Sequence, residues 1–208
     1  MSKRNSVFDG LLNDNTVLSS LMVISPVIMC GDTVRNAIAV IYAFSAITFF
    51  SVVIGSFVPR KLPYAIRVII YTLISSLVFV PVKMVAQEFF PEVISRIGIY
   101  FMLLAVNSLI MVQTEAKFYK MKRGRMIVSL IFYILGFDVV MLITSFVREL
   151  IAQGTVYDRV VDIDTLISGF GMQFGGFIFL GLFCGLYRKI RSMMRKENNG
   201  GDGNVSDN

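Results

Sequence analysis

The stretch NAIAVIYAFSAITFFSVVIGSFVP, residues 36–59, contains no charged side chain and is long enough to cross a bilayer as a helix, which takes about 20 apolar residues. Hydrophobic residues make up 55% of the 208-residue chain and charged residues 16%, a composition that does not fit a water-soluble surface. Further charge-free runs lie at 15–31, 68–82, 97–114, 126–137 and 165–187. The sequence therefore predicts an all-α membrane protein with six transmembrane helices.

The first charge-free run differs from the second in its interruptions. It contains Pro26 and ends at Gly31-Asp32, so it is short for a complete crossing. We expect the first segment, and the equivalent fourth segment, to be short or broken helices.

The cationic residues predict the orientation of the chain in the membrane. Six crossings place both termini on one side, and fifteen of the twenty Lys and Arg residues then lie on that side. Cytoplasmic loops carry an excess of Lys and Arg, so we predict a multi-pass protein of the cell (inner) membrane with both termini in the cytoplasm. The net charge of +6 does not indicate a nucleic-acid partner, because the cations lie between apolar runs that contact the lipid bilayer.

The composition also excludes several kinds of site. The chain has no histidine, and its two cysteines, Cys30 and Cys184, are too few and too far apart in sequence for a zinc site or a disulfide framework. No nucleotide or flavin motif is present. We therefore expect at most a non-catalytic subunit of a larger enzyme.

Short matches relate the two halves of the chain. IGSFV at 54–58 corresponds to ITSFV at 143–147, and these matches fall in the second and fifth segments. Short apolar matches also arise by chance, but their consistent order favours a duplication. Three segments per half is an odd number, so equivalent segments run in opposite directions, which predicts an inverted repeat of about 15–90 and 92–190.

A second match points to a site within this repeat. Ser25 precedes Asp32 by seven positions, and Ser108 precedes Glu115 by the same interval. Inverted-repeat folds bind ions, substrates or cofactors near the midplane, where the equivalent segments meet. Ser25 and Ser108 are therefore candidate site residues, whereas Asp32 and Glu115 are expected to end helices or contact a neighbouring subunit.

Several further motifs together resemble a known family. They are Asn15-Thr16-Val17-Leu18, Val58-Pro59-Arg60, Ile97-Gly98-Ile99 through Asn107 to Glu115-Ala116-Lys117-Phe118, Leu135-Gly136-Phe137, Arg148-Glu149-Leu150-Ile151, Gln153-Gly154-Thr155 and the sequence GFIFLGL at 176–182. Over roughly residues 8–190 the chain is similar to the integral membrane subunits of the Rnf and Nqr electron-transport complexes, and within them to the RnfE and NqrD type.

This resemblance implies a partner and a cofactor. It implies a six-helix inverted repeat that pairs with a homologous subunit of inverted topology, alongside the other subunits of an Rnf/Nqr-like complex. The two chains share a [2Fe-2S] cluster, each giving one cysteine from its first segment and one from its fourth. Those positions are occupied here by Ser25, before Pro26, and Ser108, after Asn107. Hydroxyls are poor substitutes for thiolates, so no cofactor is expected in this chain as written.

Two other features of the fifth segment have open interpretations. Asp138 lies between Phe137 and Val139, where a lipid-exposed carboxylate would cost several kcal/mol. It is a candidate for an ion pathway, and a hydrogen-bonded helix contact explains it equally well. Arg148-Glu149 is interpreted as a structural ion pair that reaches lipid headgroups or a neighbouring loop.

The sequence leads to one functional hypothesis and one alternative. We expect a cytoplasmic segment at 1–14, a membrane domain at 15–190 and a disordered cytoplasmic tail at 191–208. The leading hypothesis is a membrane subunit of an ion-translocating electron-transport complex, serving as scaffold and as half of the intramembrane electron path. The alternative is a paralogue without a cluster that serves as an assembly scaffold or as a carrier of a small solute or ion.

Overall fold

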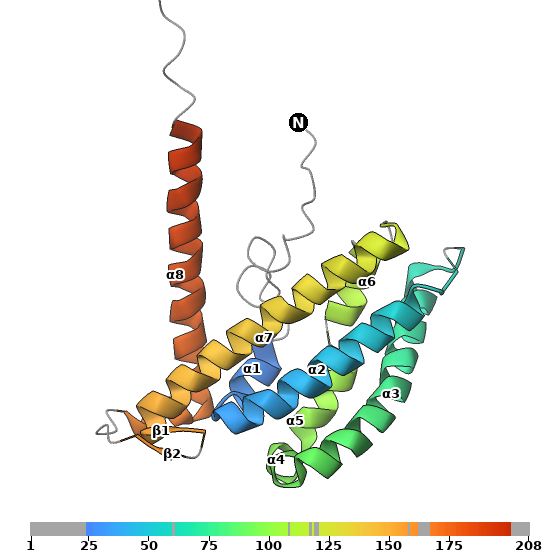
Figure 1. Ribbon diagram of the computed structural model, residues 1–208. Coiled ribbons are helices and arrows are strands. Elements are labelled where there is room, and N and C mark those ends of the chain that lie inside the picture. The colour runs from blue at the N-terminus through green and yellow to red at the C-terminus, as the bar shows by residue number, and fades with distance from the viewer. Residues whose placement is uncertain are drawn as a thin grey trace, which may run out of the picture.

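The structure is a computed structural model that describes residues 24–200, except 60, 108, 117, 119, 120, 158 and 162–166. These residues are helical apart from turns, loops and one antiparallel pair of short strands, β1 (Thr155–Val156) and β2 (Arg159–Val160). The helical elements are α1 (Ile24–Cys30), α2 (Val34–Gly55), α3 (Tyr64–Phe89), α4 (Pro91–Ile97), α5 (Ile99–Met102), η2 (Leu103–Val106), η3 (Leu109–Gln113), α6 (Thr114–Ala116), α7 (Arg123–Gln153), η5 (Ser168–Gly171) and α8 (Gln173–Gly200) (Figure 1). The predicted helical class is confirmed.

Three helices, α2, α3 and α7, are long and apolar enough to cross a membrane. The pair formed by α4 and 99–112, whose parts meet at 93°, gives a fourth span if it is taken as one unit. In α8 the apolar part ends at Tyr187, before the cations Arg188 and Lys189. Most of the first predicted segment lies outside the described residues, so six crossings stay a prediction.

The centre of the fold is α2, which packs against both α3 and α7. Its buried side chains include Ala37, Ala39, Val40, Ala43, Phe44 and Ile47. Small residues let neighbouring helices approach closely, and the rings of Phe44 and Phe137 stack with their centroids 3.8 Å apart. α2 and α7 lie side by side and run antiparallel (Figure 1).

The two matched pentapeptides occupy different positions in these helices. Residues 54–58 span the end of α2 and the turn after it, whereas 143–147 lie inside α7, which continues to Gln153. The antiparallel arrangement of α2 and α7 is the one that an inverted repeat requires, but the match does not fall at equivalent helix ends.

Two helices extend beyond the charge-free runs. α3 includes Arg67 and Lys83, and α7 includes Asp138. Arg67 is paired with Glu115, and Asp138 accepts a hydrogen bond from Ser45, so neither charge has to end its helix. The charge-free runs at 68–82 and 126–137 therefore each cover only part of a helix, and the fifth segment continues past Asp138 to Arg148 as predicted.

The fourth segment is broken, as predicted. It bends at Gly98, whose φ of 56° lies in a region that residues with a side chain rarely adopt. After η2, a 3₁₀ turn, Asn107 adopts an extended backbone, and η3 then continues as a π-helix. The Asn107 side chain donates to the carbonyl of Leu104 and accepts from the amide of Ile110, so it satisfies backbone groups on both sides of the break.

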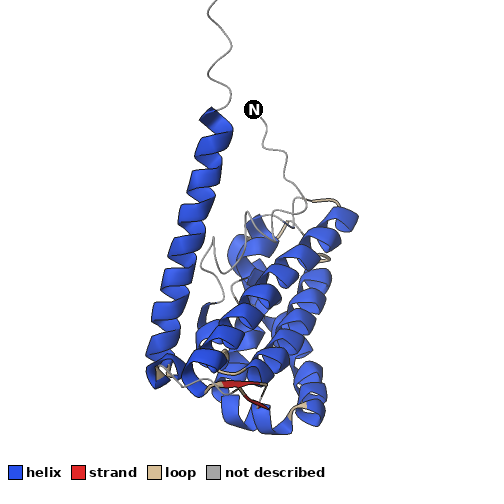
Figure 2. Ribbon diagram, turned by 60° about the vertical axis from the view of Figure 1, so that its left-hand side comes forward, coloured by secondary structure: helices blue, strands red, loops and turns tan. Residues whose placement is uncertain are grey.

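α8 extends away from the other helices and contacts them near its start, through η5 and α1 (Figures 1 and 2). The helix continues to Gly200, and the boundary at 191 for a tail stays a prediction. Arg, Met, Lys and Glu, which are good helix formers, are frequent in this stretch. Residues 201–208 and the predicted 1–14 segment lie outside the described residues.

Candidate functional site

The first candidate site residue, Ser25, lies in the first turn of α1 and is exposed. The three residues that follow it, Pro26, Val27 and Ile28, are buried. Ser25 therefore faces away from the core of this chain, where a second chain could reach it.

The second candidate, Ser108, lies outside the described residues. Its neighbours Asn107 and Leu109 are 4% and 0% exposed, and they flank the break between η2 and η3. α1 contacts α5, so the first and fourth segments do approach each other. The structure leaves the pairing of Ser25 with Ser108 as a prediction.

The cysteines do not replace the missing ligands. Cys30 is 1% exposed at the end of α1, whereas Ser25 on the same helix is exposed, so the two side chains do not share a surface. Cys184 is 5% exposed in α8. Among the described residues, no group of three or more Cys, Asp or Glu side chains is placed to hold a metal ion. Ser25 and Ser108, the positions that the resemblance assigns to the cluster ligands, carry hydroxyls, which do not fit an iron-sulfur cluster.

Asp138 lies between the two central helices. The hydroxyl of Ser45, on α2, donates to the Asp138 carboxylate and is 3.2 Å from each of its oxygens. The pair lies one residue beyond the Phe44 and Phe137 stack on each helix. Asp138 is half-buried, so it remains reachable from one side of the helix pair. Such a carboxylate can take up a proton or bind a cation within the membrane.

Arg148 is the largest fully buried side chain among the described residues, at 1% exposure. Its guanidinium donates to the carbonyl of Ile28, at the end of α1, at 2.9 Å. It also donates to the carbonyls of Phe170, Gly171 and Met172, at 3.2–3.3 Å. A side chain at Gly176 would meet the guanidinium at 3.0 Å, so the glycine makes room for it. Arg148 thus ties α1 and the η5 loop to α7.

Glu149 acts at the start of α2. Its carboxylate accepts from the amide of Val34 at 2.6 Å and from the hydroxyl of Thr155 at 3.2 Å. A carboxylate at a helix N-terminus satisfies a free amide and interacts favourably with the helix dipole. The predicted contact of Arg148-Glu149 with a neighbouring loop is confirmed. The alternative contact with lipid headgroups is wrong, because both side chains are buried.

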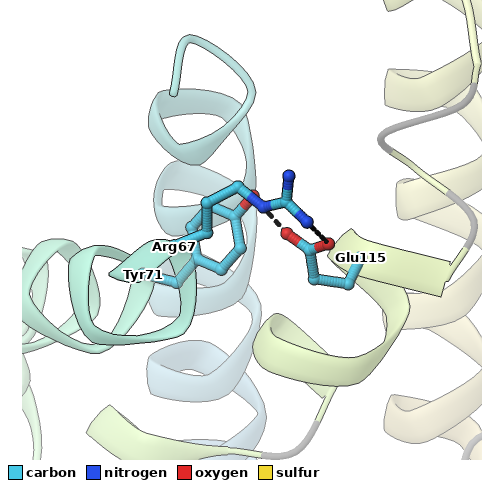
Figure 3. A network of polar contacts seen from close by, with 3 residues as sticks. All are labelled: Arg67, Tyr71 and Glu115. Atoms are coloured by element: carbon cyan, nitrogen blue, oxygen red, sulfur yellow. Dashed lines mark hydrogen bonds and ion pairs between the residues drawn. The ribbon is translucent and has the colours of Figure 1, made fainter. Parts of the chain in front are cut away.

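The two repeat-related acids have defined partners. Asp32 accepts from the amide of Thr33 at 3.0 Å and from the Asn36 side chain at 2.7 Å, between α1 and α2, so it stands at a helix boundary as predicted. Glu115 accepts from Arg67 and from the hydroxyl of Tyr71, both at 2.8 Å (Figure 3). This network joins α6 to α3 within the chain.

The sequence analysis missed Ser45 and Tyr71. Each supplies a single neutral hydroxyl to a carboxylate far away in the sequence, and no local motif marks such a pair. The one available signal was that an uncompensated acid in an apolar segment requires a donor from another segment.

Comparison with known proteins identifies relatives over most of the chain. The family model described as "Rnf-Nqr subunit, membrane protein" matches residues 4–184. The NqrD subunit of the Na⁺-translocating NADH-quinone reductase of Pseudoalteromonas translucida is 28% identical over 197 residues, covering 89% of this chain and 91% of the relative. The RnfE subunit of the ion-translocating oxidoreductase complex of Haemophilus ducreyi is 26% identical over 194 residues, 86% of each chain. With its apolar helices, the chain is a multi-pass membrane protein.

Proposed function

Because the chain belongs to the Rnf-Nqr family of membrane subunits, we propose that it is a membrane subunit of an ion-translocating electron-transport complex, serving as scaffold and as half of the intramembrane electron path. The observation that carries this proposal is the extent of the similarity, which spans 86–91% of relatives that are themselves subunits of such complexes. The flavin, NADH and ferredoxin chemistry would then belong to other subunits.

The proposed architecture is a six-helix inverted repeat of about 15–90 and 92–190, between a cytoplasmic segment at 1–14 and a cytoplasmic tail. The antiparallel α2 and α7 and the contact between α1 and α5 support it. The cationic connections that follow α2 and precede α7 lie at one end of the molecule, the end toward which α8 also runs (Figure 1). Reporter fusions at residues 160 and 200 should lie on opposite sides of the inner membrane, and the same side for both would contradict six crossings.

The proposed main partner is a homologous membrane subunit of inverted topology. Support comes from α8, where Gly181 and Gly185 face open space, with nothing within 4 Å of an added Cβ. Glycines four residues apart let a second helix approach closely. The exposed Leu182 and Leu186 beside them add apolar surface to this helix.

Ser25 and Ser108 favour a second candidate function. With hydroxyls at both family positions, the chain does not supply its half of a [2Fe-2S] site. A paralogue without a cluster, acting as an assembly scaffold or as a carrier of a small solute or ion, keeps the fold and needs no thiolates. The two candidate functions differ in the partner subunits that they require, since the first requires redox subunits and the second does not.

Purification of a tagged chain from its own membranes tests the proposal. Redox subunits of one complex should co-purify with it, and their absence under conditions that retain a homologous membrane subunit would favour the second candidate. Replacing Gly181 and Gly185 with leucine should release the homologous partner. Gly124→Leu is the control, because that glycine also faces open space but lies at the start of α7.

Asp138 is the proposed ion-pathway residue within the complex. Asp138→Asn keeps hydrogen-bonding capacity and removes the charge, so the chain should still insert and assemble. Ion transport by the assembled complex should fall sharply, because an amide does not take up a proton at physiological pH. Unchanged transport would instead assign Asp138 and Ser45 to helix packing.

A further inference from the structure

A small pocket lies between the end of α2, α6 and the start of α7. Its volume is about 170 Å³, below the roughly 300–1,000 Å³ typical of sites for drug-sized ligands. Three polar residues, Ser56, Thr114 and Arg123, line it together with the apolar Val58, Phe118, Met121 and Met126. The size restricts the ligand to a small group or to one end of a larger molecule.

Thr114 is the first sign that this pocket has a ligand. Its side chain lines the pocket and is 2% exposed, yet its hydroxyl has no hydrogen-bond partner in the described part of the chain. Burying a hydroxyl without a partner costs about 1–3 kcal/mol. The Ser56 hydroxyl donates to the carbonyl of Val53 at 2.7 Å, so its oxygen lone pairs remain available to a donor group on a ligand.

The start of α7 provides the second sign. A 31-residue helix begins here, and the side chain of its N-cap residue, Lys122, makes no capping hydrogen bond. Its first turn contains Arg123 and Arg125 and no acidic residue, so cations stand at the positive end of the helix dipole. Arg123 is held at the rim, with its guanidinium 4.5 Å from the centre of the Phe57 ring. The positive end of the helix dipole and the two arginines have no acidic residue beside them in this turn, and a bound anion would supply the negative charge.

The neighbouring acid does not fill that role. Glu115 follows Thr114 directly, but its two oxygens accept from Arg67 and Tyr71 on α3 (Figure 3). Its charge is therefore compensated away from α7. We propose that the pocket lined by Ser56, Thr114 and Arg123 binds a phosphate group, presented by an anionic lipid headgroup or as free phosphate.

The test measures ligand binding to the purified full chain in detergent, by native mass spectrometry and thermal unfolding. The probes are phosphatidylglycerol, phosphatidylcholine and inorganic phosphate. Phosphatidylglycerol should be retained, and Arg123→Gln and Thr114→Val should each weaken its binding about tenfold. Arg125→Gln is the matched control, since Arg125 lies on the same helical turn outside the pocket, and it should change binding less than about twofold.

The outcomes distinguish a lipid headgroup from free phosphate, and a specific pocket from diffuse surface charge. Displacement of the lipid by inorganic phosphate assigns the site to the free anion, and retention of phosphatidylglycerol without displacement assigns it to the headgroup. If Arg123→Gln and Arg125→Gln weaken binding equally and Thr114→Val has no effect, the proposed pocket is contradicted. Binding would then depend on diffuse surface charge. Binding of neither phosphate nor lipid would overturn it as well.

Discussion

Two helix breaks among the described residues lie at different points of the predicted repeat, the first at the end of the first segment and the second inside the fourth, and different chemistry holds them. Between α1 and α2, buried charges from α7 stabilise the break: Arg148 donates to the carbonyl of Ile28, and Glu149 accepts from the amide of Val34. In the fourth segment, neutral groups do so. Asn107 bonds to Thr48 and to the backbone on both sides, and Ser75 donates to the carbonyl of Ala105.

This difference predicts which of the two breaks tolerates substitution better. A buried charge is costly to desolvate, and removing its partner groups leaves polar atoms that water cannot reach. Neutral amides and hydroxyls cost less to bury and less to lose. The first break should therefore be the more sensitive of the two.

Arg148→Met should have the largest effect. The substitution keeps much of the side-chain volume but leaves the carbonyls of Ile28 and the η5 loop without their donor. We expect the free energy of unfolding to fall by about 3–5 kcal/mol, measured by denaturant titration in detergent micelles. Arg159→Met is the control, because Arg159 is exposed at the same end of the molecule. Equal stability of the two variants would show that Arg148 is not what holds the first break.

Glu149→Leu should have the next largest effect, about 2–3 kcal/mol, because the Val34 amide loses its acceptor and α2 loses a charge at its N-terminus. Glu149→Gln keeps an acceptor and should recover about half of that loss. The same titration measures both variants, and Glu88→Gln on the exposed surface of α3 provides the baseline. If the glutamine and leucine variants are equally unstable, the charge rather than the hydrogen bond dominates.

Asn107→Ala should be milder, with a loss of about 1–2 kcal/mol, because three neutral hydrogen bonds are removed. Thr48→Val removes one of them and should cost about 0.5–1 kcal/mol. Thermal unfolding of both proteins in the same detergent compares them with Arg148→Met. A loss for Asn107→Ala that exceeds the Arg148 value would reverse the order of the two breaks.

Much of this fold could be predicted from the sequence, because apolar runs and breaking residues act locally. The break after Cys30 follows from Gly31-Asp32. The break in the fourth segment was expected from its equivalence to the first, but its place at Gly98 was not predicted. The continuation of α7 past Asp138 could be predicted, but the hydrogen bond from Ser45, on another helix, could not. The partners of Arg148 are backbone carbonyls, which no sequence pattern marks.

The candidate site residues also differ in how far the sequence alone predicts them. Ser25 and Ser108 were predicted from spacing and resemblance, and the structure adds that Ser25 is exposed. The pocket around Thr114 was not found, because its residues come from three separate parts of the sequence that only the packing of α2, α6 and α7 brings together.

The central claim is that both breaks keep the family's backbone framework while the chain has lost its two thiolate ligands. Electron paramagnetic resonance after mild reduction tests it on the chain co-expressed with a homologous partner that retains its own two cysteines. The unmodified pair should give no [2Fe-2S] signal, and Ser25→Cys with Ser108→Cys should restore one. A normal signal from the unmodified pair would contradict the loss of ligands, and no signal from the double variant would contradict the preserved framework.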